Sequence, residues 1–168
     1  MRPETVDRSR DLDDIVCAEV ARLMPTQSMR RLTRDDVANP AAAQPVVALV
    51  DRVLAALSTR SYRGHNEREI QDQVDAALAA AALVVEREVR LDDRDRPDFV
   101  VGGQVVVEVK LKTPRSVVVR QLGRYAEHDR VAAIVLASTS FTTLRNMRMT
   151  IHQVPVFPAV LHGRGLLI

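Results

Sequence analysis

The chain has 168 residues, of which 46% are hydrophobic and 27% charged, with a formal net charge of +2. This length suits one ordinary domain with a small appendage, and the composition excludes wholesale disorder. The hydrophobic runs are shorter than the roughly 18 residues of a membrane span, the charged N-terminus lacks an apolar signal region, and the lone Cys17 excludes an internal disulfide. We therefore expect a cytoplasmic protein with no membrane partner.

Arginine dominates the basic residues. Of the 24 lysines and arginines, only Lys110 and Lys112 are lysine, so 22 are arginine. Such an excess is typical of a GC-rich genome, and a net charge of +2 does not by itself indicate a nucleic-acid partner. A lysine ammonium is compact and its pKa is adjustable, whereas arginine stays charged. The rare use of lysine therefore draws attention to position 110, although Lys112 has no comparable role.

Helices are predicted first along the chain. Hydrophobic residues at helical spacing indicate one helix over residues 11–24 and a second from Pro45 to about Leu57. A polar connector lies between them. We assign residues 1–60 to a helical N-terminal extension and residues 61–168 to the main domain.

The pattern becomes regular at Asn66. Asn66 and Glu69 form a capping box, and hydrophobic residues then recur on one face, which predicts a helix over residues 67–82. The elements expected after it are strands over residues 83–89, 98–101 and 105–111, a helix over 116–129, a strand over 131–136, a helix over 141–149, and strands over 154–161 and 166–168. From residue 66 the order is α-β-β-β-α-β, typical of an α/β domain with a mixed sheet (α+β) and additional C-terminal strands.

Asp98, Glu108 and Lys110 form the main candidate for chemistry. Glu108 and Lys110 are two apart in one predicted strand, so their side chains share a face, and Asp98 follows Pro97 in the neighbouring strand. Carboxylates from adjacent strands bind Mg²⁺, which lowers the pKa of a bound water. A lysine beside them can orient or deprotonate that water. This combination suits the hydrolysis of a phosphodiester bond.

A second interpretation needs no function. The strand over residues 105–111 alternates valines with polar residues and is amphipathic. Glu108 and Lys110 would then be a solvated ion pair, worth less than about 1 kcal/mol. The strand by itself leaves both interpretations open.

A shared metal would impose a condition on the predicted hairpin. If Gly102-Gly103 were a two-residue turn, Asp98 would pair with Val107, and Asp98 and Glu108 would lie on opposite faces of the sheet. A metal site therefore requires a three-residue loop or a β-bulge, for which glycine is well suited. We predict that one is present.

Polar residues on the two flanking helices extend the pattern. Glu67 lies three residues before Ile70 on the inward face of its helix, although it could also serve only as a first-turn acid that favours the helix dipole. Gln121 and Tyr125 are four residues apart, on the inward face of the helix that follows the lysine strand. They could also be polar edges of a core stripe.

Four features occur together in this order: Glu67, Pro97-Asp98, Glu108-Val109-Lys110 and Gln121-x-x-x-Tyr125. Together they resemble the PD-(D/E)xK nuclease superfamily, and the Gln-x-x-x-Tyr element resembles its RecB-type branch. The resemblance covers residues 66 to about 137. It implies a restriction-endonuclease-like αβββαβ core and a metal-dependent deoxyribonuclease, with endonuclease action favoured over exonuclease action. The cofactor it implies is Mg²⁺, for which Mn²⁺ can substitute, and the partner is DNA.

The resemblance also implies roles for individual residues. Asp98 and Glu108 would be metal ligands, with the Val109 carbonyl contributing. Lys110 would be the catalytic lysine and Glu67 an additional acid. Gln121 and Tyr125 would be supporting or DNA-contacting residues. Apart from the resemblance, a nuclease would need cations for the DNA phosphates, and we expect these contacts from Arg115, Arg120, Arg124, Arg145 and Arg148.

Two other functions remain open. The chain could be a catalytically degenerate nuclease fold that binds DNA or acts as an assembly module. It could also be a structural interaction protein in which residues 1–60 form a dimer interface. A homodimer would suit double-strand or junction cleavage, but the sequence defines neither the DNA structure nor the pathway.

Overall fold

The computed structural model describes residues 44–145, 147 and 150–163. Its helices and strands, in chain order, are α2 (Gln44–Ser58), α3 (Glu67–Ala80), β1 (Val85–Arg87), β2 (Phe99–Val101), β3 (Val105–Val109), α4 (Arg115–Tyr125), β4 (Ala133–Ser138), α5 (Phe141–Leu144), β5 (Thr150–Ile151) and β6 (Val154–Val160). From α3 to β4 the order is α-β-β-β-α-β, as predicted. Within the described residues, no helix is long and apolar enough to cross a membrane.

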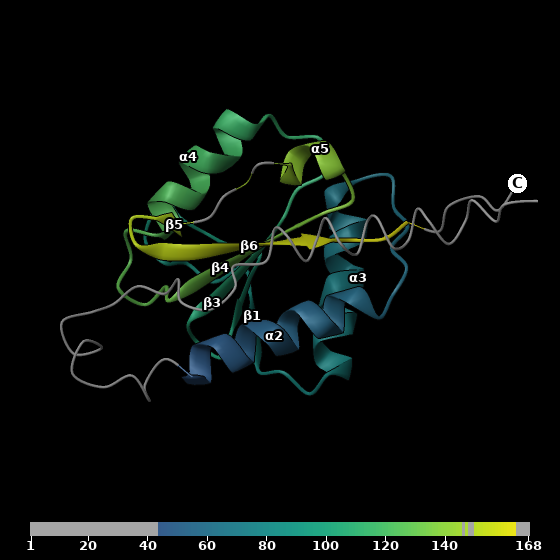
Figure 1. Cartoon of the computed structure of the whole chain (residues 1–168), viewed down its shortest axis with the longest axis horizontal. Helices are drawn as coiled ribbons and strands as arrows, with labels where there is room; N and C mark the ends of the chain where they lie inside the picture. The colour runs from purple at the N-terminus through teal and green to yellow at the C-terminus, as the bar shows by residue number, and fades with distance from the viewer. Residues whose placement is uncertain (1–43, 146, 148–149, 164–168) are drawn as a thin grey trace, which may run out of the picture.

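The strands form one six-stranded mixed sheet in the order β1-β2-β3-β4-β6-β5. The first three strands are antiparallel neighbours, β3, β4 and β6 run parallel, and β5 pairs antiparallel with β6. In Figure 1, α2 and α3 lie on one side of the sheet, and α4 and α5 lie on the other. The expectation of an α/β domain with a mixed sheet is confirmed at this level.

Both faces of the central strands are buried. Every residue of β3 and β4 is buried, as expected for strands that are covered on both faces. On the α2 and α3 face, Val105 and Val107 belong to a core that includes Val53 of α2 and Val74 of α3. The predicted helix after Pro45 is therefore present, and it packs on the same core as α3, across the boundary that we drew after residue 60.

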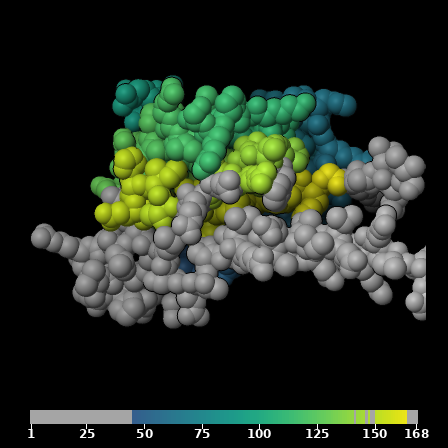
Figure 2. Space-filling view, turned by 45° about the horizontal axis from the view of Figure 1, so that its top comes forward, coloured from purple at the N-terminus to yellow at the C-terminus, as the bar shows by residue number. Residues whose placement is uncertain are grey.

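The other face of the sheet carries a second core beneath α4. Val106 of β3 and Ile134 of β4 pack there with Leu122 of α4 and Leu144 of α5. Figure 2 shows this side, with α4 in green above the yellow C-terminal strand. Because β3 lies between two cores, its one polar residue, Glu108, is buried.

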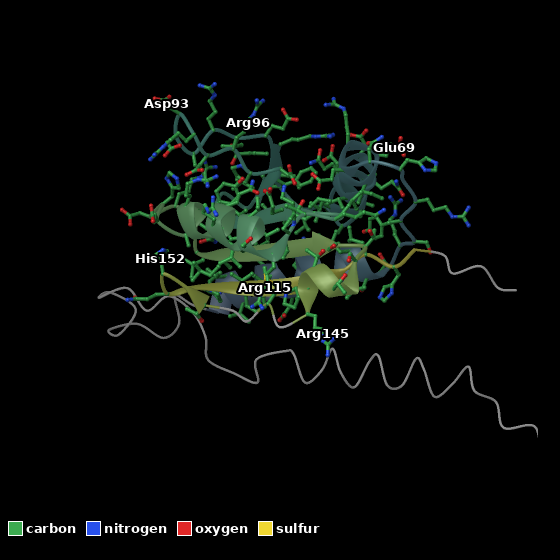
Figure 3. The ribbon with its side chains drawn as sticks, turned by 90° about the horizontal axis from the view of Figure 1, so that it is seen from above. Glu69, Asp93, Arg96, Arg115, Arg145 and His152 are labelled. Carbon is green, nitrogen blue, oxygen red and sulfur yellow. The ribbon has the colours of Figure 1, made fainter. Side chains whose placement is uncertain are left out.

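Asn66 caps α3 as predicted, but the reciprocal half of the capping box differs, because Glu69 accepts from the Asn66 side chain and the His65 N–H and not from the Asn66 N–H. Asn66 Oδ1 accepts the Glu69 N–H at 3.0 Å, and Asn66 Nδ2 donates to Glu69 Oε1 at 2.8 Å. The other carboxylate oxygen of Glu69 accepts the His65 N–H at 2.8 Å. Glu69, labelled in Figure 3, thus holds the first turn of α3 and defines where the helix begins.

The β2–β3 hairpin has the three-residue loop that the sequence predicted. Val101 pairs with Val105, so the loop contains Gly102, Gly103 and Gln104, and the Gln104 N–H donates to the Val101 carbonyl at 3.2 Å. The two glycines have φ values of +56° and +73°, which glycine adopts at little cost. Continuing this register by one residue beyond Phe99↔Val107 brings Asp98 opposite Glu108, on one face of the sheet.

The prediction for the segment after β4 was partly wrong. We expected a helix over residues 141–149, but α5 ends at Leu144, and β5 forms a short hairpin with β6. The turn of this hairpin places His152 and Gln153 at φ values of +46° and +66°. Such turns usually carry asparagine or glycine, so the sequence has no signal for this one.

The first predicted strand is shorter than expected. Instead of residues 83–89 it covers only Val85–Arg87, and at its carboxyl end the extended backbone is interrupted by Glu88, which has a φ of +52°. The predicted helix over residues 11–24 and the strand over 166–168 lie outside the described residues.

The loop glycines provide a matched pair of substitutions. A Cβ at residue 102 would come within 2.7 Å of Leu49 Cδ2, whereas a Cβ at residue 103 would meet nothing within 4 Å. Since a left-handed backbone costs a non-glycine residue about 1–2 kcal/mol, we expect Gly103→Ala to lose about that much stability and Gly102→Ala to lose more. Urea denaturation measures both values, and equal losses would contradict the contact with Leu49.

Candidate functional site

The polar side chains singled out in the sequence meet where β3 ends and β2 begins. β3, β4 and β6 are parallel, so their carboxyl ends lie at one edge of the sheet. In Figure 1 this is the edge towards which β6 points, on the side of α3 and α5. Such an edge is a common position for a binding site in open α/β sheets.

Asp98 lies just before β2, and both of its carboxylate oxygens are held. The Val109 N–H donates to Oδ2 at 2.7 Å, and Gln71 Nε2 donates to Oδ1 at 2.8 Å. The two donors come from different elements, β3 and α3. The carboxylate is thus oriented rather than free to rotate.

Glu108 is the most deeply buried acid of the site, with 1% of its surface exposed. Its Oε1 accepts from Gln121 Nε2 at 2.7 Å and lies 2.7 Å from Lys110 Nζ. Its Oε2 accepts the Asp98 N–H at 3.3 Å. Glu108 therefore links the ends of β2 and β3 with α4.

Lys110 is not a solvated residue. Only 11% of its side chain is exposed, and its ammonium lies 2.7 Å from Glu108 Oε1 and 3.9 Å from Glu67 Oε2. The interpretation of Glu108 and Lys110 as a solvated pair on an amphipathic strand is therefore wrong. Water cannot solvate this pair freely, because α4 covers the face of the sheet on which Glu108 and Lys110 lie.

Glu67 joins the start of α3 to the end of β3. Its Oε1 accepts the Leu111 N–H at 3.2 Å and the Thr113 hydroxyl at 3.5 Å, while its Oε2 faces Lys110. Its side chain is 37% exposed, so it is far more accessible than Glu108, the other acid that faces Lys110, which is 1% exposed. The predicted inward position of Glu67 is confirmed.

Gln121 and Tyr125 complete the site from α4. Gln121 Nε2 donates both to Glu108 Oε1 and, at 2.6 Å, to the Tyr125 hydroxyl. Tyr125 is buried in the core beneath α4, and burial raises the pKa of its hydroxyl, as does the charge of Glu108. It stays protonated, and Gln121 is positioned as the bridge between it and the acid.

Burial and mutual repulsion perturb the two central acids. Burial raises the pKa of Glu108 to about 7, and the neighbouring charge of Asp98 adds to this, while Lys110 opposes it. Burial likewise raises the pKa of Asp98, against the hydrogen bond from the Val109 N–H and the charge of Lys110. Burial alone would lower the pKa of Lys110, but the charge and hydrogen bond of Glu108 raise it overall. Lys110 is therefore an ammonium.

This donor set fits a divalent cation. Among the described residues, each Asp98 oxygen accepts one hydrogen bond and Glu108 Oε2 accepts one, so each keeps a lone-pair position. Repulsion from the Asp98 carboxylate contributes to the raised pKa of Glu108, so the single ammonium of Lys110 does not compensate both acids. Glu67 Oε2 adds a third carboxylate oxygen, 3.9 Å from the same ammonium. Hard oxygen donors with uncompensated charge match Mg²⁺, which needs only one or two carboxylates.

The arginines expected to contact DNA differ in their surroundings. Arg120 is exposed, and Arg145 projects outward after α5 (Figure 3). Arg115 is exposed too but already has an interaction within the chain. Arg124 donates from Nε to Asp95 Oδ1 at 2.7 Å, so that part of its guanidinium is occupied. Arg148 lies outside the described residues.

A second polar cluster lies away from these acids. Asp92, Asp95 and His128 bring ligand atoms within 4.8 Å of one another, the one such group in the described part of the chain. Asp95 is buried and is satisfied by Arg124 and by His128, whose Nε2 lies 3.3 Å from Oδ2. The cluster therefore has a structural explanation, because it ties the β1–β2 loop to α4.

Sequence reasoning missed Gln71. This residue lies four positions after Glu67, which is one helical turn, so both occur on the same stripe of α3. That spacing was a usable signal once Glu67 had been placed on the inward face. Thr113 was also missed, and it has no comparable signal because it lies in the loop between β3 and α4.

Comparison with models of known protein families, with curated protein sequences and with solved structures finds no match to this chain.

The raised pKa values predict how stability depends on pH in the absence of metal. Glu108 binds a proton below about pH 7 in the folded state but only below about 4.5 when unfolded. Between these values the folded state holds the extra proton, so stability is present at low pH and is lost as the pH rises, by up to about 1.4 kcal/mol per pH unit.

Denaturation in EDTA between pH 4.5 and 7.5 tests this expectation. The wild type should lose stability across that range, and Glu108→Gln should show a clearly smaller slope. A wild-type stability that rises through the same range, with the same slope in Glu108→Gln, would contradict the raised pKa of Glu108.

Proposed function

We propose that this chain is a metal-dependent deoxyribonuclease of the PD-(D/E)xK type, in which α3 to β4 form a restriction-endonuclease-like core. One observation carries the proposal. The three-residue hairpin loop puts Asp98 opposite Glu108 on one face, with the Lys110 ammonium 2.7 Å from Glu108. Two acids and a lysine from adjacent strand ends suit phosphodiester hydrolysis with a bound metal.

The arrangement of elements supports the same proposal. The antiparallel strands β1, β2 and β3 precede α4, and β4 then returns parallel to β3. Helix α3 contributes Glu67, and α4 contributes Gln121 and Tyr125, to one cluster. The residues of this cluster come from α3, α4 and the ends of β2 and β3, which are distant from one another in sequence.

In the proposed site, Asp98 and Glu108 would hold Mg²⁺, with the Val109 carbonyl as a further ligand. When bound, the metal would lower the pKa of a coordinated water and neutralise charge that develops on the phosphate. The chain itself supplies a charged Lys110, whose ammonium has three donors and uses one on Glu108. The raised pKa of Lys110 favours a role as a donor that orients water or phosphate over a role as a proton acceptor.

Glu67 and Gln121 act on Lys110 and Glu108 from either side. Gln121 donates to Glu108 Oε1, the oxygen that also faces Lys110. This contact leaves Glu108 Oε2 directed towards Asp98, whose N–H it accepts. Glu67 holds the backbone just after Lys110 through the Leu111 N–H. The ammonium is therefore confined between two carboxylates.

Cleavage of DNA with Mg²⁺ or Mn²⁺ tests the proposed function. We expect the wild type to cleave, and Asp98→Ala or Lys110→Ala to lower the rate by at least about 10²-fold, the effect expected when a group that acts in the reaction is removed. Lys112→Ala is the matched control, since Lys112 is exposed and has no place in the cluster. It should retain activity within a few-fold.

The contrary outcomes are distinct. A wild type that does not cleave, or cleavage that survives both substitutions, would reject the nuclease. Salt-sensitive DNA binding without cleavage would instead favour the catalytically degenerate module.

A further inference from the structure

We propose that Gln71 of α3 is a positioning residue that holds the Asp98 carboxylate ready for a divalent cation. The inference rests on the proposed metal-dependent function and concerns a residue outside the four features of the nuclease resemblance. Its direct observation is the hydrogen bond from Gln71 Nε2 to Asp98 Oδ1, at 2.8 Å.

The two donors to Asp98 act as a pair. The Val109 N–H holds Oδ2 from the β3 backbone, and Gln71 holds Oδ1 from α3. A carboxylate held at one oxygen can still turn about its Cβ–Cγ bond, but donors on both oxygens define its plane. Since the Val109 N–H belongs to the backbone, Gln71 is the side-chain contribution to this orientation.

Helix α3 is a firm support for such a contact. It starts at a capped Glu67 and buries Ile70, Val74 and Leu78 in the core. Successive turns of the helix then reach the two halves of the site, since Glu67 contacts the end of β3 and Gln71 contacts the residue before β2. One rigid helix therefore contacts both strand ends and fixes the distance between them.

A neutral amide is the appropriate donor at this position. A lysine or arginine would form an ion pair with Asp98 and compete with a cation for its charge, while an acid would repel it. Glutamine donates one hydrogen bond and leaves the carboxylate its full charge. Side chains that orient metal ligands in this way commonly contribute 10–100-fold to metal affinity.

The same helix offers a matched control in Gln73. Gln73 accepts the Arg63 N–H at 3.0 Å and donates to the Arg63 carbonyl at 2.6 Å, so it holds the loop before α3 and not the site. Both glutamines are half-buried on α3. Methionine is similar in size to glutamine, so replacing either glutamine by methionine removes the amide and keeps the bulk of the side chain.

The test is a calorimetric titration of the metal-free full chain with Mn²⁺. We expect Gln71→Met to raise the Kd for Mn²⁺ about tenfold or more and Gln73→Met to change it less than twofold. Gln71→Asn keeps the amide but shortens its reach, so it should weaken binding as Gln71→Met does. It also carries the test if the methionine variant fails to fold by circular dichroism.

The outcomes separate this inference from the proposed function. Asp98→Asn should abolish Mn²⁺ binding. If the wild type binds Mn²⁺ and Asp98→Asn does not, but both Gln71 variants bind as the wild type does, the role of Gln71 is overturned while the nuclease proposal stands. If the wild type binds no Mn²⁺, the proposed metal site and the role of Gln71 fall together.

Discussion

A buried ion pair constrains the whole edge of this sheet. Removing a carboxylate and an ammonium from water costs several kcal/mol per ion, so Glu108 and Lys110 require compensating partners. The structure supplies them from three directions: Asp98 at the start of β2, Glu67 on α3 and Gln121 on α4. Each flanking element is held to the end of β3 by at least one of these contacts.

The pair is buried because β3 lies between two cores. Helices α2 and α3 cover one face of the sheet and α4 covers the other, so every residue of β3, Glu108 included, is buried. The same burial raises the pKa of both central acids and leaves negative charge poorly compensated. A site of this kind favours a cation of higher charge than one lysine, which is the physical basis for the proposed metal.

The proposals assign complementary parts to the helices. Helix α4 presents Gln121 to the side of Glu108 that faces the lysine, whereas α3 presents Gln71 to Asp98. In this scheme each carboxylate is oriented by one neutral amide, and the ionic charge stays available for the metal and the phosphate. Because the two amides belong to helices on opposite faces, the orientation of both acids depends on how these helices pack on the sheet.

Local pattern was sufficient for much of this protein. The helical spacing and capping residues predicted α3, and the alternation in the valine-rich strands predicted that Glu108 and Lys110 share a face. Two adjacent glycines indicated the hairpin, and the requirement for a shared face predicted either a three-residue loop or a β-bulge, of which the structure has the loop. Only tertiary packing decided that Glu108 is buried, that Arg124 is engaged by Asp95, and that Gln71 reaches Asp98. Those facts depend on which elements cover which face and on side chains that meet from distant positions. Helical spacing indicates that Gln71 shares a stripe with Glu67, but it does not specify the contact with Asp98.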